Sequence, residues 1–152
     1  MPAAPLPSIP VKGAMPCIER GCSACCHDIE MLLTEDDLGG LSRERPGEEF
    51  WFVADDGYLQ LKTRVGPAAK GGEGRPCWFL SPDGTCSVHA SRPEGCRLYP
   101  AVWSDDLRAA ELDKDYCPHT DGFLLPAATN DAVRRLAQRL QDERRRRQPS
   151  AK

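Results

Sequence analysis

The sequence contains no long apolar run and no segment of the kind that directs export. No part of its 152 residues approaches the ~20 consecutive apolar residues of a membrane-spanning helix. Residues 1–16 hold five prolines, with no basic segment ahead of an apolar one, which is not the pattern of a secretory signal. We therefore expect a cytoplasmic protein with no membrane partner.

The usual catalytic signatures are also missing. The chain has no G-x-S-x-G, H-E-x-x-H or G-x-G-x-x-G motif, and the glycine-rich stretch 66–76 lacks the Lys-Ser/Thr ending of a phosphate-binding loop. That stretch is interpreted as a flexible connector. The sequence alone therefore leaves enzymatic activity undecided.

The net charge of −3 hides two regions of opposite sign. Residues 134–152 carry seven Arg and one Lys against two acids, a net charge of +6, which leaves −9 on the rest of the chain. The acidic body argues against a nucleic-acid partner, because phosphate backbones require basic surfaces. The terminal arginines are interpreted as the solvated end of a helix, with contact to an acidic partner or to nucleic acid as the alternative.

What the chain has in excess is cysteine. Eight cysteines fall into two groups, fifty residues apart: Cys17, Cys22, Cys25 and Cys26, then Cys77, Cys86, Cys96 and Cys117. Disulfides rarely persist in a reducing compartment, so these residues are predicted to be metal ligands or redox groups. The alternative is a secreted disulfide framework, which requires an export signal.

The spacing within the groups favours a soft metal. Cys22 and Cys25 are separated by two residues, as in both zinc and iron–sulfur sites. Cys25 and Cys26 are adjacent, and neighbours in an extended backbone point to opposite sides, so they are expected to serve different centres or different irons. An all-thiolate set favours zinc or iron–sulfur over magnesium or calcium. Two zinc sites, two four-iron clusters, and one cluster with spare thiols all fit this set.

The sequence resembles a known family at these cysteines and at the residues around them. The matching segments are Cys22-Ser23-Ala24-Cys25-Cys26, Cys77-Trp78-Phe79-Leu80, Gly84-Thr85-Cys86-Ser87-Val88, Arg92-Pro93-Glu94-Gly95-Cys96-Arg97-Leu98-Tyr99-Pro100 and Cys117-Pro118. They resemble the CxxCxxCC, or YkgJ-type, cysteine-cluster family, described as a zinc- or iron-chelating domain. A related cysteine module occurs in flagellin lysine N-methylases, where it is associated with a four-iron cluster.

Two arginines that bracket Cys96 are candidate cofactor-binding residues. Arg92 and Arg97 are interpreted as balancing the negative charge of a thiolate cluster, and both belong to the resemblance. The alternative is an ion pair with Glu94 or another surface acid. Each of the three histidines follows a cysteine by one to three residues, but eight thiolates make a histidine ligand unnecessary.

The remaining patterns predict a small, irregular α+β domain stabilised by metal. Thr34 and Asp37 form a capping box, which predicts a helix that begins at Glu35. Pro46 is expected to end this helix. Hairpins are expected over 50–64 and 77–88, a short strand over 29–34, and a short helix with Pro93 at its first position. The apolar spacing of residues 133, 136, 137 and 140 predicts a last helix.

Three regions are therefore expected: a disordered proline-rich arm at 1–16, a cysteine-cluster metal-binding domain at 17–128, and a C-terminal helix with a basic tail at 129–152. The favoured function is metal binding through an iron–sulfur cluster (4Fe-4S) or zinc, with a redox or electron-transfer role and a protein redox partner. The alternatives are a zinc-structured interaction module and an accessory component of a methylase-like, protein-modifying enzyme.

Overall fold

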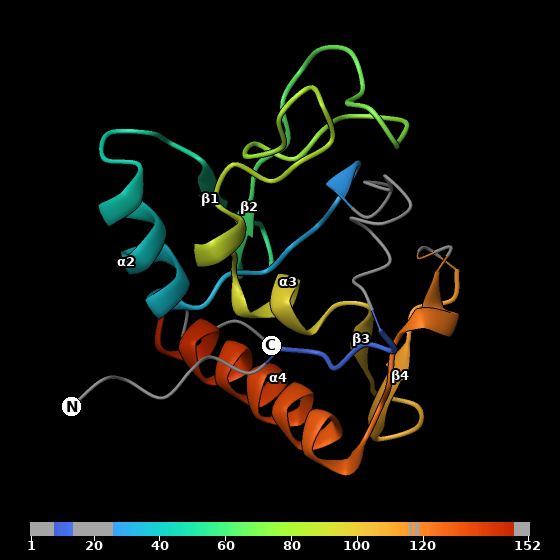
Figure 1. Cartoon of the computed structure of the whole chain (residues 1–152). Helices are drawn as coiled ribbons and strands as arrows, with labels where there is room; N and C mark the ends of the chain where they lie inside the picture. The colour runs from blue at the N-terminus through green and yellow to red at the C-terminus, as the bar shows by residue number, and fades with distance from the viewer. Residues whose placement is uncertain (1–7, 14–25, 116, 118, 148–152) are drawn as a thin grey trace, which may run out of the picture.

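The computed structural model describes residues 8–13, 26–115, 117 and 119–147, and shows short antiparallel hairpins joined by helices and long loops (Figure 1). This is the α+β architecture expected from the sequence. Three of the predicted metal ligands, Cys17, Cys22 and Cys25, lie outside the described residues.

The capping box starts the first described helix as predicted. Helix α2 (Glu35–Glu44) follows Thr34, whose hydroxyl accepts from the Asp37 N–H while the Asp37 carboxylate accepts from the Thr34 N–H, both at 3.0 Å. Leu41 is the residue of this helix that is fully buried. The helix ends before Pro46, which cannot continue it.

The first hairpin is also confirmed. Strand β1 (Trp51–Val53) pairs antiparallel with β2 (Leu59–Leu61), and Trp51 lies opposite Leu61. The turn uses Gly57 at φ 91°, a conformation that glycine adopts at little cost.

Two segments predicted as strands are reduced to isolated bridges. Residues 31–33 run beside β2 through the isolated bridge of Leu32 with Gln60. The segment 77–88 folds back on itself through the bridge of Leu80 with Cys86, and Cys77 forms a second bridge with Thr63.

In the second half of the chain, a short helix and a β-hairpin pack against the C-terminal helix. A short 3-10 helix, η2 (His89–Ser91), leads into α3 (Glu94–Leu98), for which Pro93 is the N-cap and not the first helical residue. Strands β3 (Ala101–Ser104) and β4 (Ala109–Leu112) form an antiparallel hairpin that the sequence did not predict. A further 3-10 turn, η3 (Thr120–Gly122), precedes α4 (Ala127–Arg147).

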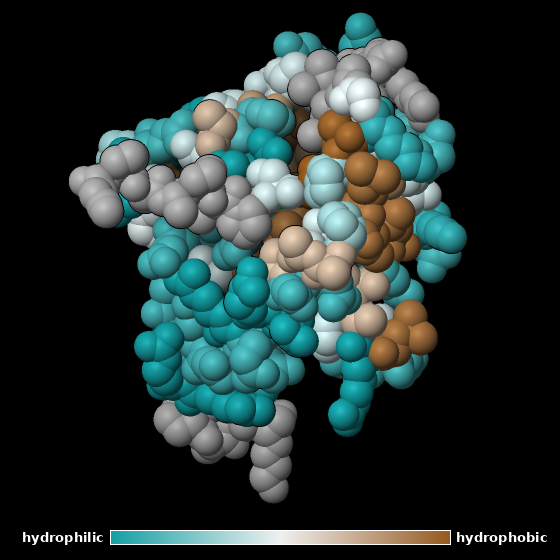
Figure 2. Space-filling model, turned by 60° about the horizontal axis from the view of Figure 1, so that its bottom comes forward, coloured by the Kyte–Doolittle hydropathy of each residue, from teal (hydrophilic) through white to brown (hydrophobic). Residues whose placement is uncertain are grey.

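Two apolar cores result. One lies under α2, β1 and β2 and is centred on Leu33, Leu41 and Phe50. The other lies between α3, the hairpin of β3 and β4 (the second hairpin from here on) and α4, where Val133 and Leu136 supply the predicted apolar face. On the face turned forward in Figure 2, polar side chains cover one half and apolar side chains gather in a band on the other.

Residues 8–13 lie against the second core, within the segment that was expected to be disordered. Ile9 is buried there, and its N–H donates to the carbonyl of Arg97 at 2.9 Å. Val11 forms a bridge with Phe123. Burying Ile9 and pairing these backbone groups offsets the entropy cost of ordering the segment.

The arginine-rich end of α4 lies beside the acidic first turn of α2. Glu143 is buried and accepts from the Glu35 N–H at 2.9 Å and from Arg139 Nε at 3.0 Å. Arg146 and Arg147 lie 3.7 and 3.4 Å from the Glu35 carboxylate. Arg145 and Arg146 keep most of their side-chain surface exposed, whereas Arg147 is more covered, so this end of the helix is solvated in part and also pairs with the acids at the start of α2.

Candidate metal centre

Five cysteines line one cavity of about 470 Å³ between the two cores. They are Cys26, Cys77, Cys86, Cys96 and Cys117. The structure thus brings one member of the first cysteine group together with all four members of the second.

Backbone pairing holds Cys26 beside Cys77. The carbonyl of Cys26 accepts from the Cys77 N–H at 2.7 Å, and the next residue, His27, forms a bridge with Pro76. These contacts span the fifty residues between the two groups. The remaining cysteines come from three further elements: Cys86 from the folded-back loop, Cys96 from α3, and Cys117 from the turn after β4.

The cysteines interact electrostatically around this cavity. Burial, with a smaller contribution from the neighbouring Cys26 and Cys86, raises the pKa of Cys77 to about 12. Burial also raises the pKa of Cys96 well above its usual range, and Cys77, Cys26 and Cys86 all act in the same direction. Thiols held together in this way stay protonated unless a cation compensates their charge, which is what a bound metal supplies.

Backbone amides are already directed at two of the sulfurs. The N–H of Phe79 donates to Cys77, and the N–H of Val88 donates to Cys86; each bond lowers the pKa of its thiol. In both cases the donor lies two residues after the cysteine. Hydrogen bonds to the charged form stabilise a thiolate, so this loop fits a site that holds anionic sulfur.

The cysteines surround the cavity without converging on a point. Among the residues that the structure describes, no three His, Cys, Asp or Glu side chains lie close enough together to hold one metal ion. The soft donors and the amides fit a thiolate-bound metal group. Which of the eight cysteines bind it stays a prediction.

The two arginines predicted to balance the cluster both line the cavity. Arg92 lowers the pKa of Cys86 through its charge, and its Nη1 donates to the carbonyl of His89 at 2.8 Å. Arg97 donates to the carbonyls of Arg92 at 3.2 Å and Ala90 at 2.5 Å, so it also fixes the backbone that leads into α3.

A third arginine, Arg64, was missed by the sequence reasoning. Its charge lowers the pKa of Cys77, and its guanidinium donates to the carbonyl of Leu80, inside the loop that carries Cys77 and Cys86. Its Nε is buried and has no hydrogen-bond partner among the described residues. No motif surrounds Arg64. Backbone pairing of residues 62–64 with 76–78 brings it to the site, including the bond of its own N–H to the Pro76 carbonyl at 2.8 Å.

The glycine-rich stretch 66–76 is mostly exposed but contacts His27 and Asp28 at two points. The buried His27 accepts the Ala69 N–H on Nε2 at 3.0 Å, which places its ring proton on Nδ1 in the neutral form. The neighbouring Asp28 accepts from the Arg75 N–H at 2.9 Å. These bonds fix the chain that follows Cys26, and they give His27 a structural role.

The comparison with protein families agrees with this site. Residues 16–118, two thirds of the chain, match the CxxCxxCC family, whose description is "Putative zinc- or iron-chelating domain". The chain belongs to the CxxCxxCC family. Comparisons with the curated proteins and with the solved structures found no match. In the described ranges, no helix has the length and apolar character needed to cross a membrane.

The CxxCxxCC match confirms the resemblance seen in the sequence and supports chelation of zinc or iron. The family match ends at residue 118, so α4 lies outside the matched region. This helix nevertheless packs on the matched region, where it contacts α3, β3 and β4.

Proposed function

We propose that this CxxCxxCC protein holds an iron–sulfur cluster in the cysteine cavity and transfers electrons to a protein partner. The observation that carries the proposal is that Cys26, Cys77, Cys86 and Cys96 interact around one cavity, where backbone amides are directed at two of the sulfurs. The cavity of about 470 Å³ has room for a group of several atoms, and cysteine thiolates are the usual ligands of an iron–sulfur cluster.

The surroundings of the cavity favour a redox role. Hydrogen bonds to the sulfurs and nearby charge set the potential of a cluster, and here Phe79 and Val88 supply amides while Arg64 and Arg92 supply positive charge. Thr85, Ser87 and His89 beside Cys86 are exposed. The edge formed by residues 85–89 therefore offers a short path for an electron from Cys86 to a partner at the surface.

Anaerobic purification followed by iron, zinc and acid-labile sulfide analysis tests the proposal. We expect iron and sulfide in equal amounts and a visible absorbance that bleaches with dithionite. Cys96→Ser should lose this absorbance, whereas Ser42→Ala on the exposed side of α2 should keep it. Stoichiometric zinc without sulfide would overturn the proposal in favour of an interaction module. A cluster that no reductant or oxidant converts reversibly would overturn the electron-transfer role.

A further inference from the structure

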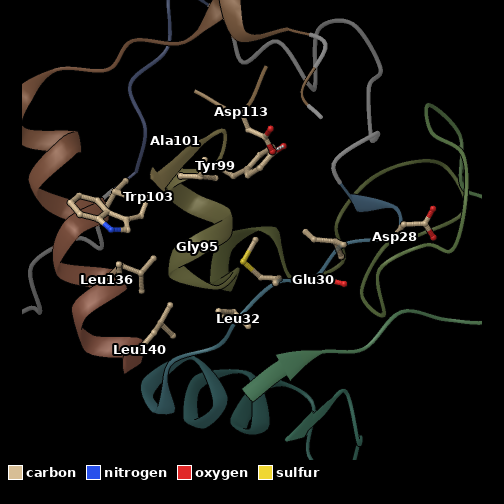
Figure 3. A pocket seen from close by; sticks show the side chains of 15 residues that line it. Asp28, Glu30, Leu32, Gly95, Tyr99, Ala101, Trp103, Asp113, Leu136 and Leu140 are labelled. Atoms are coloured by element: carbon tan, nitrogen blue, oxygen red, sulfur yellow. Dashed lines mark hydrogen bonds between the residues drawn. The ribbon is translucent and has the colours of Figure 1, made fainter. Parts of the chain in front are cut away.

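A second cavity, of about 490 Å³, lies on the other side of α3 from the cysteines. It is bounded by residues 28–32, α3, β3 and α4 (Figure 3). Consecutive residues of α3 serve the two cavities, since Gly95 lines this one and Cys96 lines the other. Met31 and Tyr99 line both. A ligand in the second cavity would therefore lie within one layer of side chains of the proposed cluster.

Glycine at position 95 is what allows Met31 to lie in this wall. A Cβ at Gly95 would come within 2.5 Å of Met31 Sδ. Without a side chain there, the flexible thioether rests on α3. The wall between the cavities is thus thin and adaptable.

The second cavity is apolar at one end and acidic at the other. Trp103 of β3 and Leu136 and Leu140 of α4 form the apolar end in Figure 3, and Asp113 lies beside Tyr99 toward the opposite end. Asp28 lies at the outer edge, where its carboxylate points away from the cavity and accepts from the Arg75 N–H. A pocket of this volume suits a small organic molecule, since ligand sites usually combine an apolar wall with a few placed polar groups.

The charge of the pocket selects the ligand. Its polar lining consists of Tyr99 and three acids, Asp28, Glu30 and Asp113, and none of its lining residues in the described ranges is Lys, Arg or His. Tyr99 donates to Asp113 Oδ2 at 2.7 Å, which orients this carboxylate. An anionic ligand would be repelled, whereas an ammonium group would gain charge-assisted hydrogen bonds.

We propose that this pocket binds a small organic amine, with its apolar body between β3 and α4 and its ammonium group at the acidic end. The apolar part of the ligand is then buried against an apolar wall, and its positive charge lies close to carboxylates. Binding rests on the lining alone and does not depend on which metal occupies the cysteine cavity.

Isothermal titration of the full chain with three isosteric probes tests the charge selection. We expect hexylamine to bind at least tenfold more tightly than hexan-1-ol, and hexanoate not to bind. Asp113→Asn keeps an acceptor for Tyr99 and removes one charge, so hexylamine should bind at least fivefold more weakly while hexan-1-ol is unaffected. Asp55→Asn, at an exposed turn outside the pocket, is the matched control and should change neither affinity.

A second variant tests the apolar end. Ala137→Trp places an indole in the space between α4 and β3 and should abolish binding of both hexylamine and hexan-1-ol; its thermal unfolding curve shows whether it folds. Equal affinity for amine and alcohol, or an amine affinity that Asp113→Asn leaves unchanged, would overturn the proposal. These measurements record the heat of ligand binding, whereas the iron–sulfur proposal is tested by metal analysis and visible absorbance. The two proposals can therefore fail or succeed independently.

Discussion

Replacing Gly72 with alanine tests whether the glycine-rich loop sets the position of Cys26. A Cβ at Gly72 would overlap Nδ1 and Cε1 of His27 and lie 3.1 Å from its Cγ. The ring is buried and accepts the Ala69 N–H, so it has little room to rotate away. The clash must then move either the loop or the chain that continues from Cys26.

The cost follows from the size of the overlap. Carbon atoms in contact normally stay about 3.5–4.0 Å apart, and an extra methyl group in a well-packed site costs about 1–3 kcal/mol. For a chain of this size, each kcal/mol lowers the melting temperature by about 2–4 °C. Gly72→Ala should therefore lower the melting temperature by about 2–12 °C.

Gly39→Ala is the matched control, because it adds the same methyl group where space exists. A Cβ at Gly39, inside α2, would meet only Arg43 Nη1 at 3.7 Å. Alanine is a better helix former than glycine by about 1 kcal/mol. The two variants should therefore shift the melting temperature in opposite directions, as measured by circular dichroism.

Metal content separates a local clash from a displaced ligand segment. If the loop positions Cys26 through His27, Gly72→Ala should bind less metal per chain than the parent after identical anaerobic purification, and Gly39→Ala should bind the same amount. A Gly72→Ala protein with an unchanged melting temperature and full metal content would refute the reasoning.

Four further outcomes follow from individual contacts. Thr34→Ala removes the side-chain half of the α2 cap and should cost about 1 kcal/mol in thermal unfolding. Glu143→Leu removes the acceptor of the Glu35 amide and leaves Arg139 with Asp36 as its remaining carboxylate, and it should cost about 1–3 kcal/mol by urea denaturation. Arg64→Leu should lower the amount of metal retained during dialysis against a chelator, because it removes the positive charge beside Cys77. Arg64→Lys keeps a charge there and should retain more metal than the leucine variant. Equal retention in both variants would contradict this. Burial raises the pKa of Asp37, so the native state keeps this proton at a pH where the unfolded chain has lost it. The resulting stabilisation is complete below the ordinary carboxyl pKa and is lost as the pH rises through the pKa of the folded state. The free energy of unfolding of the parent, relative to that of Asp37→Asn, should therefore fall from acid to neutral pH.

The elements that local chemistry determines were predictable from the sequence. The Thr34–Asp37 capping box, the Asp-Gly turn ending at Gly57 and the spacing of Val133 and Leu136 each depend on residues a few positions apart. The cysteine spacing in turn predicted a chelating domain, which the family match supports. In each case the physical cause lies within one short window of the chain.

The second hairpin was missed because its turn carries no glycine signal. Between β3 and β4 the positive φ of 51° belongs to Arg108, and Ser104 Oγ stabilises the turn by accepting the Leu107 N–H at 3.3 Å. A non-glycine residue in this region is uncommon, so composition alone does not indicate the turn. Arg64 was missed for a different reason: its role depends on pairing with Pro76, twelve residues away across an irregular loop.

The position of the cysteine cavity connects the metal to the fold. Cys77 belongs to the core under α2 and the first hairpin, whereas Cys117 belongs to the core under α4. Cys96 lies in α3, close to Cys77, Cys26 and Cys86. A group bound by thiolates from both sides would hold the two cores together, and its binding free energy would add to the stability of the native state. In a chain of short strands and irregular loops, the centre proposed to carry electrons would then also be the contact that completes the domain.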